Sequence, residues 1–128
     1  MSQVRPSESL LVDFSSLVAW YRTHCDGDWE HTHGIRLETL DNPGWQLTVD
    51  LVRTNLQGRS MEDVIEGCNP DGHPVSLRWI NCVVRENRFR GACDPTQLQR
   101  LFAAFERFSS LKDGSATPNN AMNRTREF

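Results

Sequence analysis

A proline–glycine turn between two alternating segments limits what this chain can fold into more than any other feature. Residues 35–39 alternate apolar with polar side chains, and so do residues 45–51. A period of two with one apolar face is typical of half-buried β-strands. Pro43 and Gly44 stand between the segments, where proline presets the first φ of a type II turn and glycine accepts the positive second φ. The sequence therefore predicts a β-hairpin over residues 35–51, with Pro43 and Gly44 as its structural turn residues.

Helical periodicity is found on both sides of this hairpin. Residues 9–24 predict a helix that starts near Ser7 or near Asp13, since both side chains could cap it. At residues 94–97, Asp94 is a cap followed by proline in the first turn, which predicts a second helix start. The apolar stripe of that helix consists of Leu98, Leu101, Phe102, Phe105 and Phe108. A helix with such a stripe must bury it, most simply on a sheet.

The middle of the chain gives weaker signals. Residues 54–66 suggest a third strand, although residues 61–66 fit a helix equally well. A turn is predicted at residues 69–72 and a long strand at residues 75–84, whose inward face is ambiguous because its apolar residues fall on both parities. A turn at Glu86 and Asn87 then leads to a short strand around Phe89.

The predicted fold class is α+β: an N-terminal helix, an antiparallel meander sheet of four to five strands, and a C-terminal helix, with both helices packed on one sheet face. A chain of 128 residues with 38% hydrophobic residues fits one domain. We expect a flexible N-terminus over residues 1–8, the domain over residues 9–112 and a disordered tail over residues 113–128.

Composition restricts the classes of function. No apolar run approaches the roughly 18 residues of a membrane span, and the polar N-terminus lacks the layout of a secretory signal. We therefore expect a cytoplasmic protein with no membrane partner. The four cysteines, Cys25, Cys68, Cys82 and Cys93, are too widely spaced for a C-x-x-C pair and are expected to be free thiols. A pI near 5.8 argues against nucleic acid as the main partner, despite a small basic cluster of Arg85, Arg88 and Arg90 beside Phe89.

Charge is unevenly distributed along the chain. Between residues 24 and 50 there are six acidic residues and one basic residue, whereas residues 78–112 carry seven basic and three acidic residues. Such segregation can present an acidic face to a basic partner and speed association. The alternative is that charges distant in sequence intermix on the folded surface.

Residues 24–33 hold the densest cluster of reactive side chains. In an extended backbone His31 and His33 would share one face, which permits a metal site completed by a carboxylate such as Asp41. A thiol enzyme would need positive charge to stabilise the thiolate of Cys25, but its neighbours are acids. A small metal- or thiol-dependent enzyme that uses residues 24–33 is thus the alternative to a binding protein, and a solvated polar loop is the structural alternative to either.

The tryptophans divide into two groups. Trp20, Trp45 and Trp79 lie in apolar periodic segments and are expected in the core. Trp29 sits among acids in a loop broken by glycine, so it either plugs the end of the core or serves as an exposed anchor for a partner.

Two motifs carry a family resemblance. Cys-Asp-Gly-Asp-Trp-Glu-His at residues 25–31 and Leu-Asp-Asn-Pro-Gly-Trp at residues 40–45, supported by Trp-Ile-Asn-Cys at residues 79–82, resemble the immunity protein 53 family of bacterial polymorphic toxin systems over about residues 12–108. The resemblance implies an α+β domain that is encoded beside a toxin and inhibits it by binding. It implies no cofactor and no catalytic residue, and the oligomeric state stays open.

This resemblance makes the two motifs the candidate toxin-binding residues, which are Asp26, Asp28, Trp29, Glu30, His31, Asp41, Asn42 and Trp45. An acidic loop that carries Trp29 next to a rigid hairpin would offer an aromatic anchor and charge for steering. Such an acidic plug would suit a nuclease toxin with a basic cleft. The alternative is a scaffold role, in which Asp41 and Asn42 hold the turn and Glu30 or His31 satisfies backbone amides.

Overall fold

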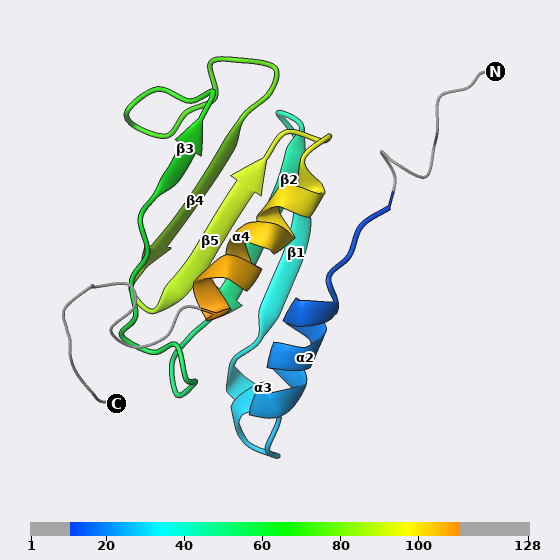
Figure 1. Cartoon of the computed structure of the whole chain (residues 1–128), viewed down its shortest axis with the longest axis vertical. Helices are drawn as coiled ribbons and strands as arrows, with labels where there is room; N and C mark the ends of the chain where they lie inside the picture. The colour runs from blue at the N-terminus through cyan, green and yellow to red at the C-terminus, as the bar shows by residue number, and fades with distance from the viewer. Residues whose placement is uncertain (1–10, 111–128) are drawn as a thin grey trace.

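A five-stranded antiparallel sheet forms one layer of the molecule, and the helices form the other (Figure 1). The computed structural model describes residues 11–110, so the N-terminus expected to be flexible and the tail expected to be disordered lie outside the described residues. The strands are β1 (Ile35–Leu40), β2 (Gly44–Asp50), β3 (Val64–Glu66), β4 (Ile80–Arg85) and β5 (Arg88–Cys93). The helices are α2 (Ser15–His24), α3 (Trp29–Thr32) and α4 (Leu98–Ser110). The predicted α+β class, with the helices on one sheet face, is confirmed.

The strand order differs from a sequential meander. It is β1-β2-β5-β4-β3, so β5 lies between β2 and β4. Two antiparallel units, β1-β2 and β3-β4-β5, therefore join through the pairing of β2 with β5. Residues 51–63 link them beneath the β4–β5 turn, where Leu51 donates its backbone N–H to Asn87.

The predicted hairpin over residues 35–51 is confirmed, but its turn is not of type II. Leu40 pairs with Gly44, so Gly44 already belongs to β2, and the turn consists of Asp41, Asn42 and Pro43 with a cis peptide before the proline. Gly44 has no positive φ. It is required for another reason, since a Cβ atom there would collide with the carbonyl oxygen of Cys93 on β5.

The long strand expected at residues 75–84 was placed too early. Strand β4 begins at Ile80, and residues 75–78 leave the sheet as an exposed segment. This resolves the ambiguity of parity, because Ile80 and Cys82 face the helices and are buried. Residues 61–66 form no helix and contribute only the short edge strand β3. The turn at residues 69–72 is confirmed by a 2.8 Å hydrogen bond from Gly72 N to Asn69 O.

Helix α2 starts at the later of the two expected positions. The Asp13 carboxylate accepts hydrogen bonds from the backbone N–H (3.0 Å) and hydroxyl (2.7 Å) of Ser15. Helix α4 begins at Leu98, just after the turn that Asp94 caps. The side chain of Gln99 on α4 bonds the backbone of Asp13 and so ties the two helices together.

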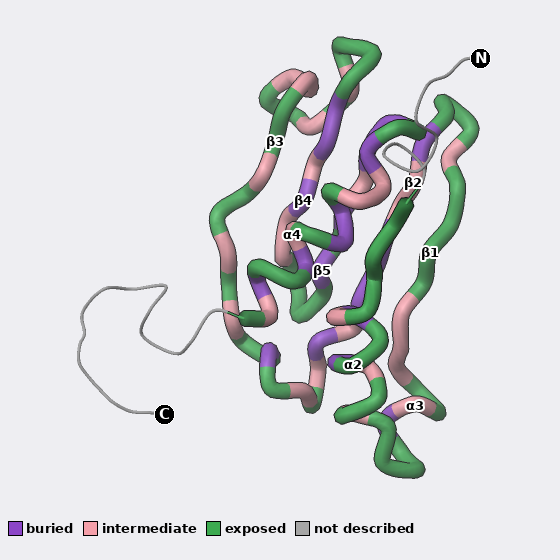
Figure 2. The backbone as a smooth tube through the Cα atoms, turned by 45° about the vertical axis from the view of Figure 1, so that its right-hand side comes forward, coloured by how far each residue is buried: buried purple, intermediate pink, exposed green. Residues whose placement is uncertain are grey.

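The core fills the space between α4, α2 and the helix-facing side of the sheet. Figure 2 shows buried backbone along the central strands and along one side of α4. The stripe residues Leu101, Phe102, Phe105 and Phe108 are buried as predicted, and Phe105 packs edge-on against Phe89 with ring centroids 5.3 Å apart. Gly91 on β5 leaves room for Leu101. The opposite sheet face carries no helix in the described part of the chain (Figure 1).

Candidate functional site

The candidate contact residues lie at two opposite ends of the sheet. Strand β1 starts beside α3 and ends at the β1–β2 turn (Figure 1). Six residues of extended strand span about 20 Å. We call residues 25–33 the loop end, and the β1–β2 turn (41–43) together with residues 74–79 and 94–96 the turn end. The expectation that the acidic loop lies next to the hairpin turn is therefore wrong.

At the loop end, two carboxylates hold the loop itself. Glu30 accepts hydrogen bonds from the backbone N–H groups of Asp26 (2.9 Å) and Gly27 (2.8 Å). Asp26 in turn accepts from the N–H groups of Asp28 and Trp29, both at 2.9 Å. The bonds from Trp29 and Asp28 lower the pKa of the Asp26 carboxyl, and bonds from its own backbone N–H and those of Asp26 and Gly27 lower the pKa of Glu30. Glu30 thus has the scaffold role that the sequence left open, and Asp26 has a similar role that was not predicted.

The remaining polar side chains of the loop end are only partly engaged. Asp28 forms an ion pair with Arg53 at 3.0 Å, although 72% of its side chain is exposed. His31 is exposed on the outside of the short helix α3. His33 is half-buried and lies 3.9 Å from the Asp50 carboxylate.

Trp29 is a core residue and not an exposed anchor. Only 1% of it is exposed, and its indole N–H donates to the carbonyl oxygen of Val52 at 2.8 Å. Its ring packs edge-on against Trp20 and Tyr21, with centroids 6.0 and 6.1 Å apart. The structure thus selects the first of the two alternatives for Trp29, the plug at the end of the core, and removes it from the surface available to a partner.

The loop end does not have the geometry on which the metal hypothesis depends. Residues 29–32 form a helical turn, so the extended backbone that would place His31 and His33 on one face is not present. Among residues 11–110, no three His, Cys, Asp or Glu side chains come together as a metal site requires. His24 is committed elsewhere: Nε2 accepts from the backbone N–H of Asn55 at 3.3 Å, and Nδ1 lies 2.9 Å from the carbonyl oxygen of Trp20.

The turn end presents side chains that the fold does not use. Asp41 and Asn42 are exposed, and within the described residues neither side chain makes a hydrogen bond or ion pair. The scaffold role proposed for them is therefore not seen. Trp45 is half-buried, packs against the core as expected, and its indole N–H donates to Pro95 O at 3.3 Å.

Sequence reasoning missed the apolar segment of the turn end. Val75 is 67% exposed and Leu77 is 95% exposed. A hollow of about 510 Å³ lies between this segment and the β1–β2 turn, and Trp79 is among its lining residues together with Pro43 and Pro95. The available signal was the change of parity between Leu77 and Ile80, which marks the point where the chain leaves the sheet.

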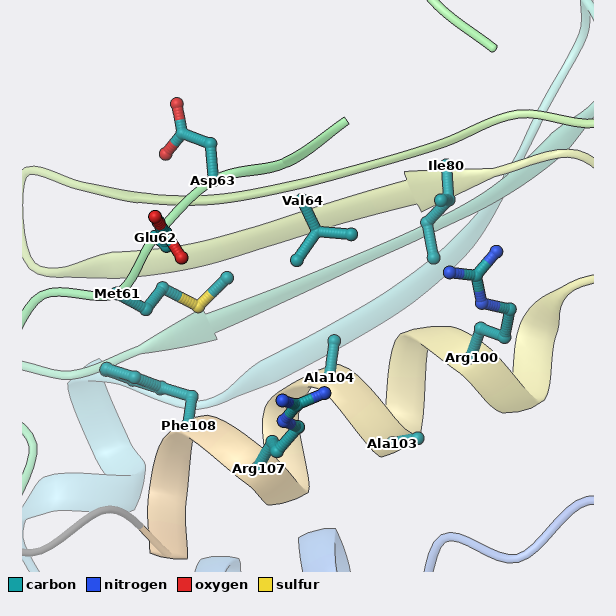
Figure 3. A pocket seen from close by; sticks show the side chains of 10 residues that line it. All are labelled: Met61, Glu62, Asp63, Val64, Ile80, Arg100, Ala103, Ala104, Arg107 and Phe108. Carbon is teal, nitrogen blue, oxygen red and sulfur yellow. The ribbon is translucent and has the colours of Figure 1, made fainter. Parts of the chain in front are cut away.

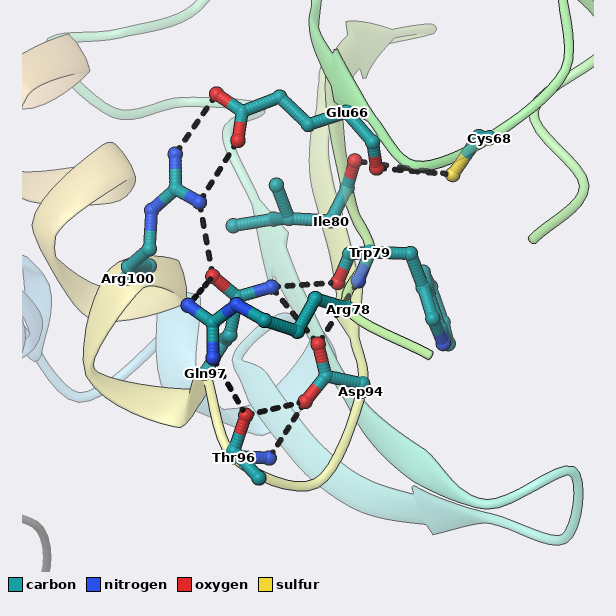
Figure 4. Close-up of polar contacts among 9 residues, drawn as sticks. All are labelled: Glu66, Cys68, Arg78, Trp79, Ile80, Asp94, Thr96, Gln97 and Arg100. Carbon is teal, nitrogen blue, oxygen red and sulfur yellow. Dashed lines mark hydrogen bonds and ion pairs between the residues drawn. The ribbon is translucent and has the colours of Figure 1, made fainter. Parts of the chain in front are cut away.

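A polar network fixes the base of the turn end (Figure 4). Asp94, which is 2% exposed, accepts hydrogen bonds from the backbone N–H of Trp79 (2.8 Å) and from the N–H (2.8 Å) and hydroxyl (2.6 Å) of Thr96. Gln97 donates to Asp94 at 2.8 Å and to the carbonyl oxygen of Trp79 at 3.0 Å. Burial opposes ionisation of Asp94, but these hydrogen bonds outweigh it and lower its pKa to about 2.

A second cavity, of about 360 Å³, lies between β3 and α4 (Figure 3). Its apolar lining includes Met61, Val64 and Phe108. Of the charged side chains on its rim, Arg100 is bound to Glu66 at 2.9 Å and Asp63 to Arg85 at 2.7 Å. Neither this cavity nor the hollow at the turn end is lined by any residue of the reactive segment 24–33.

Two arginines of the basic cluster are paired with carboxylates, and the phenylalanine beside it is buried. Arg85 and Arg88 form ion pairs with Asp63 and Asp50, and Phe89 is fully buried toward the helices. Phe89 therefore cannot stack on a base. Within residues 11–110, no helix is long and apolar enough to cross a membrane.

Comparison with known families adds a finding that geometry alone does not supply. A family model described as Immunity protein 53 matches residues 14–110. The matched span contains every helix and strand of the described residues. The comparisons with curated proteins and with solved structures gave no match.

Proposed function

The chain belongs to the immunity protein 53 family, and on that basis we propose that it binds and neutralises a cognate toxin as a stoichiometric inhibitor. The family match, which covers residues 14–110, is the observation that carries this proposal. The proposed setting is the cytoplasm of a bacterium with a polymorphic toxin system, where the protein protects the cell that makes the toxin.

The features of the described surface support binding more than turnover. The reactive side chains of residues 24–33 lie outside both cavities, and Asp26 and Glu30 are bound to backbone N–H groups of their own loop. The turn end, by contrast, combines exposed apolar side chains with those of Asp41 and Asn42, which have no partner among residues 11–110. Exposed apolar surface rimmed by polar groups is typical of protein-binding sites.

A basic toxin, and a nuclease in particular, is the partner class that we propose. Of the acidic residues in segment 24–50, Asp28 and Asp50 pair with Arg53 and Arg88, whereas Asp41 is exposed at the turn end and Glu38 is exposed on the strand that leads to it. Acidic surface steers a basic partner and raises its association rate. A neutral or acidic toxin that this protein nevertheless inhibits would contradict this part of the proposal.

The test is growth of cells that produce the toxin domain encoded next to this gene, with and without this protein. We expect rescue of growth and a one-to-one complex on co-purification. A matched control replaces this chain with an unrelated acidic protein of similar size, which should not rescue. Normal folding of the protein without rescue or complex would reject the proposed function.

A further inference from the structure

We propose that the turn end is the surface on which the toxin docks. The occupant is a segment of the toxin that inserts an apolar side chain beside Leu77, into the hollow, and places a lysine or arginine against Asp41. This inference rests on the proposed function. It adds the surface of this protein that the toxin contacts and the kinds of toxin side chain that bind there. Of the two motifs that the sequence offered as contact residues, it selects the one around Asp41 and Asn42 over the loop end.

The exposure of Leu77 is the first observation behind the proposal. Leu77 is 95% exposed and Val75 is 67% exposed, on a segment that contributes neither residue to the core. Isolated apolar residues on a surface need no explanation. Here, however, Leu77 itself lines a hollow of about 510 Å³, together with Pro43, Pro95 and Trp79. Val75 lies two residues away on the same exposed segment.

The segment that carries Leu77 is held at both ends. On one side, Val75 N donates to Gly67 O at 2.9 Å. On the other, the Arg78 guanidinium donates to Thr96 Oγ1 at 3.3 Å and to Gln97 Oε1 at 3.1 Å. A segment fixed in this way loses little conformational freedom when a partner binds, which favours affinity.

Charge on the rim indicates the chemistry of the partner. Asp41 is exposed, and within residues 11–110 its carboxylate has no hydrogen-bond or ion-pair partner. Asp41 adjoins Asn42, which lines the hollow. The carboxylate that lines the hollow itself, Asp94, is buried and accepts hydrogen bonds from Trp79, Thr96 and Gln97. Arg78, also at the turn end, is exposed, and its guanidinium donates hydrogen bonds to the neutral acceptors Thr96 Oγ1 and Gln97 Oε1. Asp41 is therefore the group at this surface that is available to a basic side chain.

The loop end offers less to a partner. Its aromatic residue, Trp29, is buried, and the carboxylates of Asp26 and Glu30 are bound to the loop's own N–H groups. Asp28 keeps an exposed carboxylate but already pairs with Arg53. This difference supplies a matched comparison between the two ends, because Asp28 and Asp41 are exposed aspartates on opposite sides of the molecule.

The experiment measures the affinity of the full-length protein for the toxin domain encoded next to its gene, using the wild type and four variants. Leu77→Asp should raise Kd by about 30-fold or more, as expected for an apolar side chain that becomes buried in the complex. Asp41→Lys should slow association by about tenfold and reduce its dependence on salt. The controls Leu11→Asp, at a leucine that is 73% exposed and does not line the hollow, and Asp28→Lys should change Kd by less than about threefold. Circular dichroism and thermal unfolding establish that each variant is folded.

The outcomes separate the two proposals. If the wild type neither binds nor neutralises the toxin, the proposed function and the docking surface both fail. If the wild type binds and folded Leu77→Asp and Asp41→Lys bind equally well, the toxin is the partner but the turn end is not its docking site. Loss of binding in Asp28→Lys alone would assign the contact to the loop end. Conversion of a dimer to a monomer by Leu77→Asp, with unchanged toxin binding, would make the surface a contact between two copies of this chain.

Discussion

Asp94 is the residue whose ionisation matters most for the turn end. Its carboxylate joins the start of β4, through Trp79, to the turn before α4, through Thr96 and Gln97. A buried carboxylate normally resists ionisation, but here the hydrogen bonds favour the charged form and lower its pKa from 3.8 to about 2. The folded state therefore holds the proton less tightly than the unfolded chain does.

The fold is therefore less stable at acidic pH. A depressed carboxyl pKa stabilises the fold above the unfolded pKa and loses this effect as the pH falls through the folded pKa. We expect Asp94→Asn to lower the free energy of unfolding by about 2 kcal/mol at pH 7, a difference that shrinks between pH 4 and pH 2. Urea unfolding at several pH values measures it. Asp71→Asn, at an exposed aspartate, is the control. If the difference in free energy of unfolding between wild type and Asp94→Asn does not vary with pH, ionised Asp94 is not the source of the stabilisation.

Glu30 provides a second prediction at the scale of one residue. Its carboxylate accepts from the backbone N–H groups of Asp26 and Gly27. In Glu30→Ala those groups lose their partner, so we expect their amide hydrogen exchange to accelerate by about tenfold or more while the amides of β5 are unchanged. Nuclear magnetic resonance resolves both sets. Unchanged exchange at Asp26 and Gly27 would mean that Glu30 does not hold the loop and is free for another role.

The contact between α4 and β5 depends on a residue without a side chain. A Cβ atom at position 91 would lie 2.9 Å from a methyl carbon of Leu101 and 3.2 Å from Cys82 Sγ. Both neighbours are fully buried. We therefore expect Gly91→Ala to lower the free energy of unfolding by about 1–3 kcal/mol, measured by urea denaturation, through overpacking of the core.

A double-mutant cycle tests the cause of that destabilisation. In a Leu101→Ala background the methyl carbon is absent, so the added Cβ should cost less than it does in the wild type. Equal costs in the two backgrounds would show that the contacts of the added Cβ with Cys82 Sγ and Phe89, and not the contact with Leu101, are responsible.

The elements that the sequence predicted well are those fixed by local pattern. The hairpin of β1 and β2 and the stripe of α4 follow from periods of two and of 3.6 residues, and the family motifs lie on them or beside them. The turn was misjudged because Gly44 serves a contact with Cys93, which is distant in sequence. The place of β5 between β2 and β4 is likewise a pairing that no local pattern encodes.

The candidate site was harder to predict, for the same physical reason. The burial of Trp29 depends on Trp20, Tyr21 and Val52, which come from three other parts of the chain. The separation of the two motifs depends on the length and direction of β1, along which they lie at opposite ends. Asp26, Asp28, His31, Asp41 and Asn42 are exposed, whereas Trp29 is buried and Trp45 is half-buried. Where these side chains lie relative to one another could be read only from the fold.

The four free cysteines of the molecule differ in how deeply they are buried. Cys25 is exposed and Cys68 is intermediate, whereas Cys82 and Cys93 are buried on the central strands β4 and β5. Burial raises the pKa of the Cys82 thiol to about 12 and that of Cys93 to about 11. Since the thiolate is the reactive form, both buried thiols are protected by their chemistry as well as by their position.

We therefore expect native protein at pH 8 to be modified rapidly at Cys25, slowly at Cys68, and at Cys82 and Cys93 only when the sheet opens. In a Cys25→Ser, Cys68→Ser variant, which retains only the buried pair, the labelling rate at increasing urea should give the same free energy of unfolding as circular dichroism, because β4 and β5 lie at the centre of the sheet. Mass spectrometry of the labelled peptides identifies the site. If the labelling rates of Cys82 or Cys93 give a much smaller free energy than circular dichroism does, α4 separates from the sheet without unfolding of the sheet. The core would then consist of two units and would not unfold as one cooperative whole.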